Sequence, residues 1–267
     1  MNYSSRTRCH LTFVALASTL FLLSPAGTAR ADQFQYSLVN DFSNTQNPNG
    51  VWSYNYNAAP ISVYQTFWWG EAGWGNLWIG DGCIIRGSQP TGTDPWGNPA
   101  GPSHDWQPGD VMMHALSMPY GGDTTFLNVT WTSPADGMID ISGRAWDGEI
   151  LPDRDVAWSL MLNGQTIAQR SSVLGLYRSD AGAQFASNLV GNNSLTGIPV
   201  TQGEVLAFQV ATDTYYGQFV GVQENITLTT VPEAGTFSLL VTGIAGLMLG
   251  RRFSLKPRGV TSHAALR

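Results

Sequence analysis

The clearest pattern of β-strands in this chain is LNVTWTSPADGMIDIS, which runs from Leu127 to Ser142. Apolar and polar residues alternate on both sides of a turn-forming sequence, Pro-Ala-Asp-Gly, at 134–137. The apolar members are Leu127, Val129 and Trp131 before the turn and Ile139 and Ile141 after it. A period of two is typical of a strand with one buried face, so this stretch predicts two antiparallel strands joined by a turn.

The same alternation recurs further along the chain. It is carried by Leu206, Phe208 and Val210, and by Ile226 and Leu228. Asn163-Gly164 lies between two further apolar runs, and this dipeptide is a strong signal for a two-residue hairpin turn. No long apolar stripe with a helical period appears. Residues 32–230 therefore predict a mostly β domain, a single jelly-roll-like β-sandwich with room for about nine to eleven strands.

The N-terminus has the three parts of a secretory signal peptide. Arg6 and Arg8 precede the apolar run LTFVALASTLFLL at 11–23, and Ala29-Arg30-Ala31 follows as a small-residue cleavage site. The apolar run is short for a membrane span. We expect residues 1–31 to be removed on export.

The C-terminal region combines a short motif, an apolar stretch and a basic pair. Val231, Pro232 and Glu233 come first, GTFSLLVTGIAGLMLG follows at 235–250, and Arg251-Arg252 comes directly after it. Proline at the start of a helix and arginines at its end predict a transmembrane helix with a cytoplasmic tail at 253–267. The open alternatives are a signal that an enzyme reads and removes, and a plain membrane anchor.

The order of these parts at 231–252 resembles the PEP-CTERM sorting signal of bacterial surface proteins. The resemblance rests on the VPE start, the glycine-containing apolar helix and the arginine pair. It implies processing near Pro232-Glu233 by an exosortase-type enzyme, with export alongside extracellular polysaccharide. Segments between Asp41 and Thr229 resemble, more loosely, the β-sandwich ectodomains of such proteins. The expected location is therefore transiently membrane-anchored, then at the cell surface or extracellular.

The charge of the predicted domain excludes one class of partner. Between Asp32 and Val231 there are 18 Asp and Glu residues against five Arg and no Lys, a formal net charge of −13. Nucleic-acid binding depends on Lys and Arg that neutralise phosphates, so we expect no nucleic-acid partner. Cys83 is the one cysteine outside the signal peptide, and its apolar neighbours favour an unreactive buried thiol.

Tryptophan is concentrated in one part of the chain. Seven of the ten tryptophans lie between 52 and 106: Trp52, Trp68, Trp69, Trp74, Trp78, Trp96 and Trp106. Exposed aromatic rings stack on sugars, whereas buried rings fill the core of a β-sandwich. Both interpretations stay open. The candidate sugar contacts are Trp68, Trp69, Trp74 and Trp78.

An acidic stretch at 147–155 is the candidate metal site. It contains Asp147, Glu149, Asp153 and Asp155, which offer the oxygen ligands that Ca²⁺ prefers, although their spacing is not that of an EF-hand loop. The alternative is a solvated acidic loop with no ion. We otherwise expect no cofactor.

Catalytic motifs are scarce. The chain has no His-Glu-x-x-His zinc motif and no Gly-x-Ser-x-Gly nucleophile elbow. We therefore predict an exported, non-catalytic surface or matrix protein that contacts extracellular polysaccharide. The alternatives are a structural surface protein without a ligand, and a polysaccharide hydrolase that uses two carboxylates of the acidic stretch.

Overall fold

The stretch at 127–142 forms two strands, β8 (Leu127–Thr132) and β9 (Gly137–Asp147), separated by the predicted turn. The computed structural model describes residues 31–67, 70–75, 82–88, 105–114, 126–149, 154–212 and 217–231. The predicted signal peptide, the predicted transmembrane helix and the predicted cytoplasmic tail lie outside these ranges. None of the helices in the described ranges has the length and apolar character of a membrane span.

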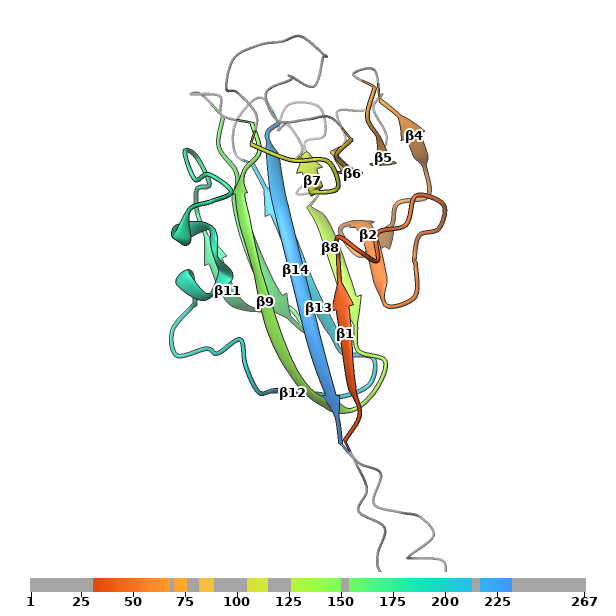
Figure 1. The fold of residues 1–267 in the computed structure, drawn as a ribbon, viewed down its shortest axis with the longest axis vertical. Coiled ribbons are helices and arrows are strands. Elements are labelled where there is room, and N and C mark those ends of the chain that lie inside the picture. The colour runs from red at the N-terminus through yellow and green to blue at the C-terminus, as the bar shows by residue number, and fades with distance from the viewer. Residues whose placement is uncertain are drawn as a thin grey trace, which may run out of the picture. The chain divides into compact units, whose positions relative to one another are not determined.

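The described residues are mostly β and form two sheets (Figure 1). In the eight-stranded sheet the order is β12 (Ile198–Val200), β9, β14 (Phe219–Thr230), β7 (Val111–His114), β6 (Cys83–Arg86), β5 (Ala72–Gly75) and β4 (Tyr64–Thr66), and β1 (Gln33–Ser37) also pairs with β14. In the six-stranded sheet the order is β11 (Gln165–Arg170), β10 (Ala157–Leu162), β13 (Val205–Ala211), β8, β2 (Trp52–Tyr56) and β3 (Ala59–Pro60). Two short 3-10 helices, η2 (Ala181–Ala183) and η3 (Phe185–Ser187), precede β12.

The residues that the sequence predicted to face inward do so in the structure. Every alternating apolar residue noted above is buried, and all belong to one core cluster to which both sheets contribute. The predicted hairpin is also confirmed. Asn163 and Gly164 have φ values of 50° and 80° and join β10 to β11, as a tight two-residue turn requires. The described residues contain fourteen strands rather than nine to eleven, because several are only two or three residues long.

A second, smaller buried cluster covers the other face of the eight-stranded sheet. It contains Phe67, Cys83, Ile85, Trp106, Met112, Trp146, Ala183 and Phe219. On each contributing strand, the neighbours of these residues point into the main core, for example Ala145 and Val220. This sheet is therefore buried on both faces over part of its length, which its alternating sequence did not predict.

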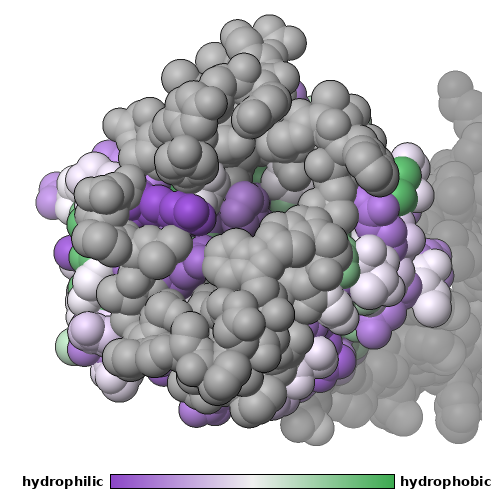
Figure 2. All heavy atoms as spheres, turned by 90° about the horizontal axis from the view of Figure 1, so that it is seen from above, coloured by the Kyte–Doolittle hydropathy of each residue, from purple (hydrophilic) through white to green (hydrophobic). Residues whose placement is uncertain are grey.

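The two ends of the compact unit Asp32–Val231 leave from the same place. The Asp32 carbonyl accepts a hydrogen bond of 2.9 Å from the backbone N–H of Thr230, and β1 lies along the last part of β14. Figure 1 shows the start of β1 and the end of β14 side by side at the bottom of the view. At the opposite end, seen in Figure 2, hydrophilic described residues lie at the centre of the view.

Candidate functional site

The outer face of the six-stranded sheet carries no charged side chain on its four central strands. Strand alternation places the following residues outward: Ala157, Ser159 and Met161 on β10, Val205, Ala207, Gln209 and Ala211 on β13, Asn128, Thr130 and Thr132 on β8, and Ser53 and Asn55 on β2. All are small, hydroxyl-bearing or amide-bearing except Met161 and Val205. In a domain with 18 carboxylates, this face stands out as neutral.

One row of this face runs straight across five strands. Strand register pairs Gln169 with Ser159, Ser159 with Gln209, Gln209 with Asn128, and Asn128 with Asn55. Paired side chains on one face of a sheet lie side by side, about 4.8 Å apart from strand to strand. The fold therefore lines up hydrogen-bonding side chains that are as much as 114 positions apart in sequence.

The half of the row on β8 and β2 is used inside the protein. The Asn55 amide donates to the Asn128 side-chain carbonyl and to the Thr130 hydroxyl, both at 3.1 Å. The Asn128 amide in turn donates to the Asn57 carbonyl at 2.6 Å. Both Asn55 and Asn128 are 4% exposed, so this half of the row is a fixed, buried network.

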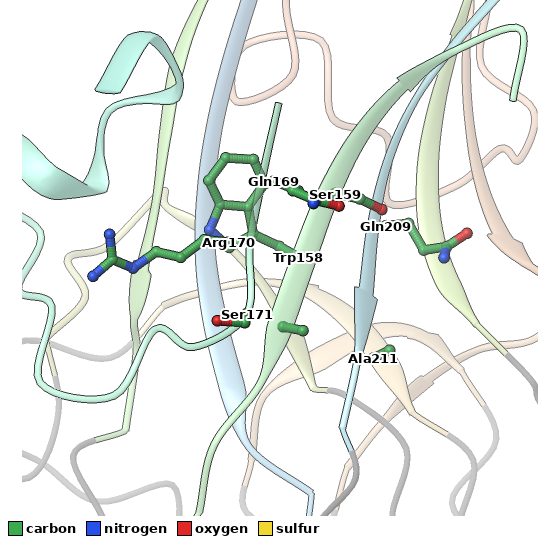
Figure 3. A pocket seen from close by; sticks show the side chains of 8 residues that line it. Trp158, Ser159, Gln169, Arg170, Ser171, Gln209 and Ala211 are labelled. Carbon is green, nitrogen blue, oxygen red and sulfur yellow. The ribbon is translucent and has the colours of Figure 1, made fainter. Parts of the chain in front are cut away.

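The half of the polar row on β11, β10 and β13 is available to bind a ligand. Within the described chain the side chains of Gln169, Ser159 and Gln209 make no hydrogen bond, and all three are exposed or half-buried. They line an open depression of about 330 Å³ together with Ala157, Ala211, Arg170 and Ser171. Figure 3 shows the three polar side chains on neighbouring strands, with the ring of Trp158 directed away from them.

Among the described residues that line the depression, Arg170 is the one that carries a charge. Its Nε donates to the Ser172 carbonyl at 2.7 Å, and its Nη1 donates to the Asn188 side chain at 3.2 Å. In Figure 3 its guanidinium extends away from Gln169 and Ser159. The free groups of the depression are therefore neutral donors and acceptors.

The outer face of the eight-stranded sheet is closed in comparison. Trp146 is fully buried there, with the guanidinium groups of Arg144 and Arg178 at 5.7 and 5.5 Å from its ring centroid. Arg178 also makes two contacts with the Asp110 carboxylate, at 2.9 and 3.0 Å. These cations and rings satisfy one another, so this face stabilises the fold rather than offering free groups.

The tryptophan prediction needs one correction. Trp74 is only 5% exposed. It packs against Tyr54 and Tyr64, and its Nε1 donates to the Ser43 carbonyl at 2.8 Å. Its ring has no face left for a sugar because the core occupies both sides. Trp68, Trp69 and Trp78 lie outside the described residues, and the sugar contacts predicted for them stay predictions.

Two carboxylates of the acidic stretch accept backbone N–H groups of the protein. Asp147 is fully buried, and its carboxylate accepts hydrogen bonds from the Gln218 amide at 2.7 Å and from the backbone N–H groups of Glu149 and Gly175. Asp155 accepts from the backbone N–H groups of Val156, Val173 and Leu174. Both carboxylates thus hold the loop at 173–175 in place.

Burial changes the acidity of Asp147. It raises the pKa of this carboxyl to about 7, and the charges of Asp155 and Glu149 act in the same direction, against the lowering effect of the N–H groups of Gly175 and Glu149. Glu149 is also buried, with the Arg154 guanidinium at 3.8 Å. For Asp147 and Glu149, burial contradicts the solvated loop that the sequence suggested as the alternative to a metal site.

The described part of the acidic stretch does not form a metal site or a pair of catalytic carboxylates. In the described ranges, no group of three or more His, Cys, Asp or Glu residues lies close enough to hold an ion. Asp153 lies outside those ranges. Both carboxylate oxygens of Asp147 already accept N–H groups, and so does Oδ1 of Asp155. Cys83 is a buried free cysteine, as predicted, and burial raises the pKa of its thiol far above the usual range.

No protein-family model, curated protein or solved structure matches this chain. Gln169, Ser159 and Gln209 are not among the candidate site residues predicted from the sequence. The sequence did contain a pattern that could have pointed to this face. In AWSLML and VLAFQVA, the residues that alternate with the buried apolar ones are all uncharged.

Proposed function

We propose that this protein is an exported, non-catalytic surface or matrix protein of the PEP-CTERM type, whose β domain contacts neutral extracellular polysaccharide. In this proposal residues 32–230 form a jelly-roll-like sandwich between a cleaved signal peptide and a sorting signal read by an exosortase-type enzyme. The observation that carries the polysaccharide contact is the uncharged, hydrogen-bonding outer face of the six-stranded sheet.

Chemistry favours a neutral sugar polymer as the partner for this face. Sugar hydroxyls both donate and accept hydrogen bonds, as the amide and hydroxyl side chains of the face do. An anionic polymer would be repelled by the net charge of −13 that the sequence gives the domain. A polysaccharide-rich surface is also the destination implied by the resemblance of the C-terminal region to a sorting signal.

A catalytic function receives less support from the carboxylates. Glycosidases need two carboxyl groups that face a substrate cleft. Asp147 and Glu149 are 0% and 2% exposed, and three donors already occupy the carboxylate of Asp147. These two residues are therefore placed to organise the loops around them.

The polysaccharide proposal is tested by affinity electrophoresis of the mature protein recovered from cells that express the full chain. We expect gels containing dextran or galactomannan, both neutral, to retard the protein, and gels containing alginate, an acidic polymer, to leave its mobility unchanged. Retardation by none of the neutral polymers would favour a structural surface protein without a ligand. Retardation by alginate alone would contradict the charge argument.

The sorting proposal has its own measurement. Val231 is exposed at the end of the domain, so the chain is accessible to an enzyme where the predicted signal begins. Mass spectrometry of the protein from the cell surface or medium should find an N-terminus near Asp32 and a C-terminus near Pro232. Recovery of a C-terminus at Arg267 from mature protein would contradict exosortase processing and leave a plain membrane anchor.

A further inference from the structure

We propose that the polysaccharide lies across β11, β10 and β13, bound by Gln169, Ser159 and Gln209. This inference rests on the proposed function and assigns its binding site to a face that the sequence did not single out. The ligand class is one strand of a neutral polysaccharide, whose successive hydroxyls meet successive side chains of the row.

The side chains of Gln169, Ser159 and Gln209 are free to form hydrogen bonds with a ligand. Each lies on a different, hydrogen-bonded strand, so the backbone fixes their spacing, while none is bonded to another part of the described protein. Neighbouring strands are about 4.8 Å apart, which is close to the length of one sugar ring in an extended chain. Each glutamine offers two N–H donors and a carbonyl acceptor, and serine offers one donor and two acceptor lone pairs.

The floor of the depression allows close approach. Ala157 and Ala211 are paired in register beside the polar row and line the depression. On the other side of the row, Ala207 is paired with Met161. Methyl groups present a low, apolar surface on which the C–H face of a sugar ring can rest. The row therefore combines a shallow apolar floor with polar groups that fix orientation, as in small-molecule sites generally.

The site is bounded on one side by hydrogen-bonded, buried side chains and on the other by the edge of the sheet. On the β8 side the row continues into Asn128 and Asn55, whose amides are already bonded and buried. On the β11 side it ends at Gln169, since β11 is the edge strand of this sheet. The available site is therefore three strands wide, which suits a short run of sugars.

A protein partner fits this face less well. Stable protein interfaces centre on aromatic or large apolar anchors. The exposed large apolar side chains of the described residues are Phe34, Val63, Met138, Leu174, Tyr177, Leu189 and Val231, and none lies on a strand of the six-stranded sheet. The face lacks the anchors that a second copy of this chain, or another protein, would bury.

The test uses the same gels with variants of the full chain. Gln169→Ala combined with Gln209→Ala should weaken binding of the neutral polymer by about tenfold to thirtyfold, because two sets of hydrogen bonds are lost. Ser159→Tyr should abolish binding, because its ring would fill the middle of the depression. Gln35→Ala is the matched control, since Gln35 is an exposed glutamine on β1 of the other sheet, and it should bind like wild type.

The outcomes separate the site from the function. If wild type is retarded and both site variants are retarded equally, the face is not the site and the proposed function stands. If wild type is retarded by no neutral polymer, the proposed function fails with it. Thermal unfolding at the wild-type temperature confirms that a variant with weakened binding is folded, and Ser159→Tyr and the double variant must agree for the proposal to hold.

Discussion

Gly221→Val should lower the free energy of unfolding by about 3 kcal/mol, the upper end of the usual cost of overpacking a buried site. Gly221 on β14 is paired with Trp146 on β9. A Cβ atom at Gly221 would lie less than 3.0 Å from Cε2, Cζ2 and Cδ2 of that tryptophan. The indole ring thus lies directly over the glycine.

Trp146 has little room to move aside. It is fully buried, its Nε1 donates to the Asp105 carbonyl, and two guanidinium groups lie beside its ring. A valine at 221 must therefore displace the ring and disturb these contacts together. The loss should appear in urea unfolding followed by tryptophan fluorescence.

Gly87→Ala is the control for this substitution. A Cβ atom at Gly87 would lie 3.4 Å from Cδ1 of Trp106, an ordinary van der Waals separation. Trp106 belongs to the same buried cluster as Trp146. We expect a change of less than about 1 kcal/mol. Equal unfolding curves for Gly221→Val and Gly87→Ala would show that Trp146 does not pack on Gly221.

The sequence predicted the inner faces of the sheets because that information is local. Alternation along Leu127–Ser142 depends only on each strand having one apolar side. The polar row was not predictable in the same way. It depends on the pairing of Ser159 with Gln209, fifty positions apart, and a shift in register of one residue would turn one partner to the other face.

Composition could not decide the exposure of the aromatic residues. The dense segment left open whether its rings contact sugars or fill the core, and Trp52, Trp74 and Trp106 are all buried. Glycine and asparagine around a tryptophan do not determine its exposure, because exposure is set by which elements pack over it. For Trp74 those partners are Tyr54 and Tyr64, one from each sheet.

Glu224→Gln should stabilise the protein at pH 8 and leave it nearly unchanged at pH 4.5. Glu224 occupies an inward position of β14, in phase with Val222 and Ile226 of the main core. It is 1% exposed, and neither carboxylate oxygen has a hydrogen-bond partner in the described part of the chain. A charge there would be buried without compensation, which is costly.

The direction follows from the acidity of this group. Burial raises the pKa of Glu224 from 4.5 to about 8. Between these values the folded protein keeps a proton on Glu224 that the unfolded chain releases. The contribution of Glu224 to stability is therefore fully present below pH 4.5 and is lost as pH rises toward 8. The loss attributable to Glu224 is on the order of 4 kcal/mol at pH 8. Glutamine carries no proton to lose, so its variant escapes this loss.

The measurement is urea unfolding of wild type and Glu224→Gln across pH 4.5–8.5, and the result is the difference between the two curves. Asp147, with a pKa raised to about 7, and His114, with a pKa lowered to about 4, also make stability depend on pH. Both groups are present in both proteins, so their contributions cancel in the difference. A difference that grows with pH supports a lone buried carboxyl, whereas parallel curves would show that Glu224 is solvated or paired with a cation.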